Sequence, residues 1–139
     1  RILNIITQPE GIPQGVMIRA IEPAAMIDQM SKNRGGKTGP DISNGPGKLV
    51  EALAIPQELY GQSIADSSLR LVFEKKKTPK KINALPRIGI PNKGVWTEKP
   101  LRFVVSGNPY ISLQRKNQIE KDWGWRKENE KEGSINIFR

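Results

Sequence analysis

Arg19 is the residue whose surroundings most suggest chemistry, because it interrupts an otherwise apolar run from Val16 to Ile21. A guanidinium in such a run needs a carboxylate, a phosphate or a polar cavity beside it. Two interpretations follow from this requirement. Arg19 either orients a reacting group or ligand, or it pairs with a buried carboxylate for structural reasons alone.

The residue types that are absent limit the chemistry further. The 139-residue sequence contains no histidine and no cysteine. This excludes imidazole bases, His-based triads, thiol nucleophiles and thiolate metal sites. Any hydrolysis must therefore depend on carboxylates, arginine, lysine or backbone groups.

A second candidate site lies where Gly45-Pro46-Gly47-Lys48 follows Asn44. Apolar residues from position 49 onward predict a helix with one buried face, which Asn44 is expected to cap. The glycines allow close approach, and Lys48 adds a positive charge, a combination that suits a phosphate group. The spacing is not that of a Walker motif. A tight helix start without any ligand is the alternative.

The charge balance favours a polyanionic partner. The chain has 23 basic and 14 acidic residues, a formal net charge of +9. Such a surface binds nucleic acid without sequence preference, although solubility alone is another reason for a high charge. No apolar run is long enough for a membrane-spanning helix, and no signal peptide opens the chain. We therefore expect a protein of a bacterial cytoplasm, an organelle or a nucleus that is not secreted and does not contact a membrane.

Hydrophobic patterns predict an α+β fold with a curved, mostly antiparallel sheet and two short helices. The predicted strands are 2–7, 16–21, 69–73, 87–90 and 101–105, and the predicted helices are 23–30 and the one after residue 44. The first two strands form a hairpin with a long loop. Because Arg1 leads directly into a strand, we expect the natural protein to extend further upstream.

Two charged segments show no regular period. The Lys-rich segment 75–81 is expected to be a solvated loop. Residues 114–139 are expected to form a charged, weakly ordered tail after a domain that spans 1–113. Within this tail, Trp123 and Trp125 either form a stacking platform for bases or are incidental to function.

Five short segments, in order and at compatible spacings, resemble the C-terminal half of the 3-methyladenine (alkylpurine) DNA glycosylases. They are Asn4-Ile5, Val16 to Pro23, Gly45 to Leu49, Arg87 to Ile90, and Lys99 to Phe103 with Gly107-Asn108-Pro109. The resemblance covers roughly residues 2 to 112, apart from the Lys-rich segment. It implies that the chain is an incomplete glycosylase domain.

The resemblance also implies a function and its residues. These enzymes flip a damaged purine, alkylated or deaminated, out of double-stranded DNA and hydrolyse its N-glycosidic bond with a water molecule. They use no metal and no cofactor, and we expect a monomer. Arg19 and the backbone carbonyl of Ile88 match the groups that hold the water. Asn4 matches a pocket residue that helps to reject guanine, and Lys48, after Gly45 and Gly47, matches a contact to the DNA backbone.

Other parts of the family's active site have no counterpart in the sequence. The glutamate that acts as general base, the aromatic residues that stack on the flipped base and the tyrosine that wedges into the duplex all lie upstream of Asn4 in the family. We therefore expect the general base to be absent from this chain. A basic nucleic-acid-binding module without catalysis, either ribosomal-type or a decayed glycosylase, is the alternative function.

Overall fold

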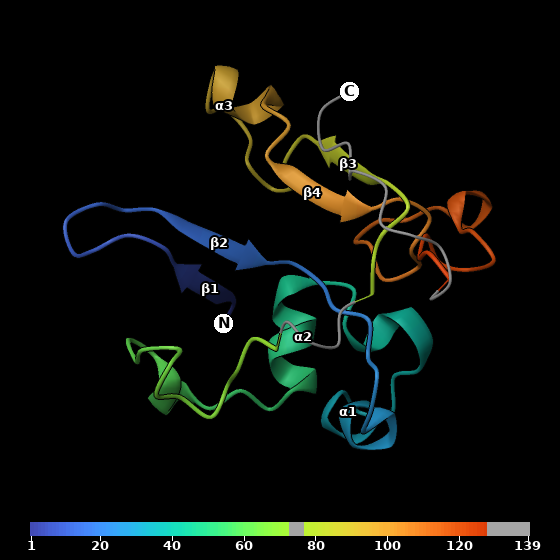
Figure 1. Ribbon diagram of the computed structural model, residues 1–139, viewed down its shortest axis with the longest axis horizontal. Helices are drawn as coiled ribbons and strands as arrows, with labels where there is room; N and C mark the ends of the chain where they lie inside the picture. Colours follow the sequence, from blue (N-terminus) through green and yellow to red (C-terminus); the bar gives the residue numbers. More distant parts are fainter. Residues whose placement is uncertain (73–76, 128–139) are drawn as a thin grey trace. The chain divides into compact units, whose positions relative to one another are not determined.

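The computed structural model describes residues 1–72 and 77–127 (Figure 1). The chain divides into two compact units. The first unit consists of Arg1–Phe73 with Tyr110–Leu113, and the second of Glu74–Pro109 with Gln114–Arg139. None of the described helices is long and apolar enough to cross a membrane.

The first unit begins with the predicted hairpin. Strand β1 (Leu3–Ile6) pairs antiparallel with β2 (Gly15–Ile18), and Asn4 lies opposite Met17. Both strands are shorter than predicted, and β2 begins one residue earlier than predicted and ends just before Arg19. The long loop between them turns at Gly11, whose φ of +89° is readily adopted only by glycine.

Short helices follow the hairpin: α1 (Ile27–Asn33), the 3-10 helix η1 (Gly39–Ile42), α2 (Pro46–Ala52) and the 3-10 helix η2 (Gln57–Leu59). The predicted helix from residue 23 starts later, at Ile27, because Met26 adopts a left-handed conformation with φ of 55°. Helix α2 is confirmed. Its N-cap, however, is Gly45 rather than the predicted Asn44, and no side chain caps it.

The core of the first unit lies between α1, η1 and α2. Met30, Ile42 and Ala52 are buried together, and Ile21 packs against them. Ser43 is completely buried. Its hydroxyl donates to the Ile21 carbonyl at 2.7 Å, and the Ile21 amide donates to the Ser43 carbonyl. These bonds hold the segment after Arg19 against the start of α2.

The second unit contains another hairpin. Strand β3 (Ile82–Leu85) pairs antiparallel with β4 (Arg102–Val105), and α3 (Val95–Glu98) lies in the connection between them. The last predicted strand is thus confirmed. The prediction of a strand at 87–90 is wrong, because the chain turns at residues 88–89, where Gly89 has φ of +74°. The strand that pairs with β4 lies five residues earlier.

The prediction of a strand at 69–73 is also wrong for residues 69–72, which the structure describes. Residues 69–72 form no strand, and residue 73 lies outside the described residues, as do 74–76 of the Lys-rich segment. Leu71 and Val72 are exposed, and no neighbouring strand supplies backbone hydrogen bonds to this segment. Alternation of apolar and polar residues cannot form a strand without such a partner.

The α+β class is confirmed by the short helices and the antiparallel strand pairs. The strands of the described residues pair as two separate two-stranded sheets, whereas the sequence predicted a single curved sheet.

Residues 114–127, the described part of the predicted tail, bind to the second hairpin and its flanks. The Glu120 amide donates to the Gly107 carbonyl at 3.0 Å, and the Arg126 amide donates to the Thr78 carbonyl at 2.9 Å. The 3-10 helix η3 (Lys116–Gln118) lies in the same segment. Residues 128–139 lie outside the described residues, and the domain boundary after residue 113 stays a prediction.

Candidate active site and nucleic-acid interface

Arg19 lies immediately after β2 and is half-buried. Its Nε atom is buried and has no hydrogen-bond partner in the described part of the chain. A buried N–H group without an acceptor is costly, so folded proteins rarely leave one unsatisfied. The arrangement therefore favours an acceptor that binds from outside, such as a water molecule or a ligand, over a purely structural ion pair.

The hairpin register relates Arg19 to Asn4. Asn4 pairs with Met17, and Arg19 follows Met17 by two residues. In extended chain, residues two apart project from the same face. Asn4 is exposed, so its amide is accessible on this face.

The start of α2 belongs to the same unit as this hairpin. A side chain added at Gly47 would meet its nearest atom, the Arg1 carbonyl oxygen, at 3.8 Å. This places Gly47 beside the chain that leads into β1. The first unit thus holds five of the six predicted site residues: Asn4, Arg19, Gly45, Gly47 and Lys48.

Ile88 belongs to the second unit. It is half-buried in the turn that follows β3. Within the described residues, no hydrogen bond ends on its carbonyl oxygen, so this oxygen is available to accept one from a bound molecule.

Arg87, next to Ile88, was not predicted as a site residue. Its Nη2 atom donates to the Trp96 carbonyl at 2.8 Å, and its Nε atom is buried without a hydrogen-bond partner among the described residues. Arg87 thus shares the unsatisfied Nε atom with Arg19, although Arg87 also has a hydrogen bond through Nη2. The signal was present in the sequence, since Arg87 also stands among apolar residues, between Leu85 and Ile90.

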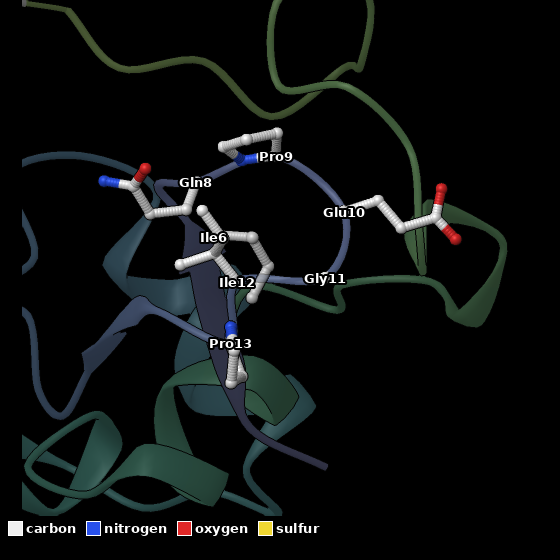
Figure 2. A pocket seen from close by; sticks show the side chains of 7 residues that line it. All are labelled: Ile6, Gln8, Pro9, Glu10, Gly11, Ile12 and Pro13. Carbon is white, nitrogen blue, oxygen red and sulfur yellow. The ribbon is translucent and has the colours of Figure 1, made fainter.

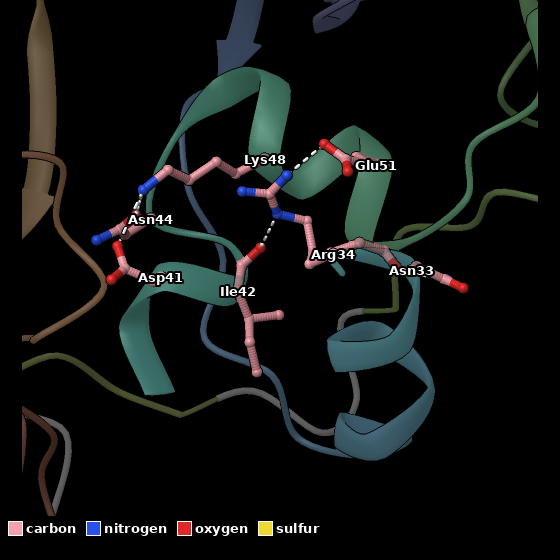
Figure 3. Close-up of polar contacts among 8 residues, drawn as sticks. Asn33, Arg34, Asp41, Ile42, Asn44, Lys48 and Glu51 are labelled. Atoms are coloured by element: carbon pink, nitrogen blue, oxygen red, sulfur yellow. Dashed lines mark hydrogen bonds and ion pairs between the residues drawn. The ribbon is translucent and has the colours of Figure 1, made fainter. Parts of the chain in front are cut away.

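Lys48 is held by two oxygen atoms in the first unit (Figure 3). Its Nζ donates to Asn44 Oδ1 at 2.7 Å and to Asp41 Oδ1 at 3.0 Å. The hydrogen bond from Lys48, and then its positive charge, lower the pKa of the Asp41 carboxyl below its ordinary value. Asn44 thus positions Lys48 instead of capping the helix. A phosphate at Lys48 would have to compete with the Asp41 carboxylate.

A shallow, open depression of about 390 Å³ lies within the loop of the first hairpin (Figure 2). It is lined by Ile6 and by residues 8–13 alone. Glu10, its only titratable residue, points away from the apolar side chains of Ile6 and Ile12. The depression contains none of the predicted site residues, and no three metal-ligating side chains cluster anywhere in the described segments.

The sequence predicts that Lys48 contacts a DNA phosphate. If it does, replacing Lys48 with alanine is expected to weaken DNA binding by the same factor for damaged and undamaged duplexes, because a phosphate contact carries no information about the base. The slope of log affinity against log salt should fall by about 1. Fluorescence anisotropy at several salt concentrations measures both quantities. Lys32→Ala, an exposed lysine on α1, is the matched control. A larger loss for the damaged duplex would contradict a pure phosphate contact.

Residues 1–109 match the model of the methylpurine-DNA glycosylase family. The chain belongs to this family. This confirms the resemblance seen in the sequence. The family match includes every predicted site residue and ends before Trp123 and Trp125.

Relatives within this glycosylase family agree with the assignment. Three of them, each named "Putative 3-methyladenine DNA glycosylase", come from Enterococcus faecalis, Listeria monocytogenes and Staphylococcus saprophyticus. They are 62%, 52% and 49% identical to the chain over 99%, 87% and 90% of its length. The matched region makes up only 61%, 58% and 62% of the relatives themselves. The chain thus spans about three fifths of these glycosylases.

Proposed function

We propose that the chain forms part of a glycosylase that removes alkylated or deaminated purines from double-stranded DNA. The damaged nucleotide would be flipped out of the duplex, and the bond between its base and C1′ of its sugar would be hydrolysed. The observation that carries the proposal is the buried Nε of Arg19, which has no acceptor among the described residues and lies within the family match.

The proposed mechanism gives each site residue one task. Arg19 would donate a hydrogen bond to the attacking water and so orient a water lone pair toward C1′. The family resemblance assigns the second contact with this water to the Ile88 carbonyl. As the water oxygen binds C1′, the N-glycosidic bond breaks and its electron pair leaves with the purine. Asn4 contacts the flipped base and disfavours guanine, whereas Lys48 with Gly45 and Gly47 contacts the DNA backbone.

The water must also lose a proton during this reaction. Neither Arg19 nor the Ile88 carbonyl can accept it near pH 7, because a guanidinium stays protonated and an amide carbonyl is barely basic. We therefore propose that a carboxylate outside these 139 residues is the general base, as the family resemblance implies. The protein would act as a monomer, without metal or cofactor, in a compartment that contains DNA.

A fusion protein tests this proposal. It joins the chain to the part of the Enterococcus faecalis relative that the chain does not span, and that relative serves as the positive control. We expect the fusion protein to release hypoxanthine or 3-methyladenine from a duplex with one lesion under single-turnover conditions, and the chain alone to release neither. DNA binding without excision by the fusion protein, beside an active control, would favour the non-catalytic alternative. Excision by the chain alone would show that the general base lies within it.

A further inference from the structure

A tight turn in the second unit presents a tryptophan to solvent. Trp123 is 40% exposed, and its φ is +55°. Bulky residues rarely adopt this left-handed conformation, because their Cβ approaches the following carbonyl oxygen. Such backbone strain costs on the order of 1 to 3 kcal/mol, so it persists only where the surrounding structure imposes it, often at functional sites.

The neighbours of Trp123 impose this conformation. The Asn108 side chain, 5% exposed, donates through Nδ2 to the Trp123 carbonyl at 3.2 Å. The next residue, Gly124, accepts from the Lys80 amide at 2.8 Å and lies so close to Ser106 that no side chain fits there. The backbone of the turn is therefore fixed on both sides of Trp123, and this backbone positions the indole ring.

Positive charge surrounds this turn. The described segments 77–81 and 120–127 contain six basic residues and two acidic residues, Glu120 and Asp122, of which Asp122 forms an ion pair with Lys80. The basic residues are Lys77, Lys80, Lys81, Lys121, Arg126 and Lys127. The Lys77 ammonium lies 5.5 Å from the centre of the Trp125 ring. We name Trp123, Trp125 and these six residues the basic-aromatic turn.

We propose that the basic-aromatic turn is a binding site for single-stranded DNA whose residues differ from those of the candidate active site. Lysine and arginine side chains would contact the phosphates, and an unpaired base would stack on Trp123. The stacking argues for single strands, because the faces of paired bases are already covered by their neighbours in a duplex. The turn lies after residue 109, where the match to the family model ends.

Trp123→Gly tests the stacking in the full 139-residue chain. Glycine readily adopts the same positive φ, so the substitution removes the ring without straining the turn. We expect it to weaken binding of a labelled oligothymidylate of about 12 nucleotides by roughly 5- to 150-fold, the effect of losing one base-stacking contact. Binding of a duplex, measured by the same anisotropy assay, should be unchanged. Trp123→Phe should retain most of the affinity.

Two further comparisons separate stacking from folding and from charge. Tyr60→Ala removes an aromatic residue that is 88% exposed in the first unit, and should leave oligothymidylate binding unchanged. Replacing Lys81, Lys121 and Lys127 together by glutamine should reduce the salt slope for single strands by about 2. The proposal is overturned if Trp123→Gly binds oligothymidylate as the original chain does, if it loses duplex and single-strand affinity equally, or if no single strand binds at low salt.

Discussion

Replacing Arg19 with alanine is expected to slow single-turnover excision of hypoxanthine by the fusion protein by roughly 10²- to 10³-fold, the usual cost of removing one preorganised hydrogen-bond donor from an active site. The Nε of Arg19 has no acceptor among the described residues, so the water that it would orient is its proposed partner. The substitution should leave the melting temperature nearly unchanged, because it removes no described hydrogen bond or ion pair within the chain.

The control for this experiment must remove the same charge elsewhere. Arg70→Ala does so at an exposed position of the same unit, and it should leave the excision rate within about twofold of the original. Arg19→Lys keeps the charge but loses the planar arrangement of donors, and is expected to recover only part of the rate. Full activity of Arg19→Ala would show that Arg19 is a structural residue.

Replacing Gly124 with alanine is expected to destabilise the second unit by roughly 2 to 6 kcal/mol, through backbone strain and overpacking together. Its φ is +78°, and an added Cβ would lie 1.9 Å from the Ser106 carbonyl oxygen. That atom belongs to the backbone, so it cannot move aside as a flexible side chain would. Urea unfolding followed by tryptophan fluorescence measures the effect, since all three tryptophans belong to the second unit.

Gly89→Ala is the matched control. Gly89 has nearly the same φ, +74°, but nothing lies within 4 Å of the position of its missing Cβ. It should therefore cost only the backbone strain, about 1 to 3 kcal/mol. If the two variants unfold at the same urea concentration, the close approach of Gly124 to Ser106 does not limit stability.

The sequence predicted those elements whose signal is local. The first hairpin, α2 and β4 follow from β-branched runs, turn residues and an apolar face. The wrong prediction at 69–72 has a non-local cause, because these residues alternate as a strand would but have no partner strand. The wrong prediction at Asn44 has a local cause, because its side-chain oxygen accepts from Lys48, four residues later, instead of capping the helix.

The candidate site stays a prediction, and the sequence signals for its residues differ. Arg19 was selected because a charge within an apolar run is rare, and the same rule could have selected Arg87, whose Nε is also buried without a described partner. The buried hydroxyl of Ser43 could not have been identified, because serine is common in loops and its partner, the Ile21 carbonyl, lies 22 residues away. Likewise, nothing local in the sequence indicates that Gly124 approaches Ser106.

Asn33 and Arg34, at the end of α1, connect three of the four described helical segments of the first unit, namely α1, η1 and α2; the contacts of Arg34 are drawn in Figure 3. Asn33 donates to the Ala52 carbonyl at 2.8 Å, whereas Arg34 donates to the Ile42 carbonyl at 3.2 Å and forms an ion pair with Glu51. Helices of seven residues or fewer are unstable in isolation. The three segments should therefore open and close as one cooperative folding unit. Ser43 binds the carbonyl of Ile21, two residues after Arg19. The backbone around Arg19 should therefore unfold locally only when these three helical segments unfold.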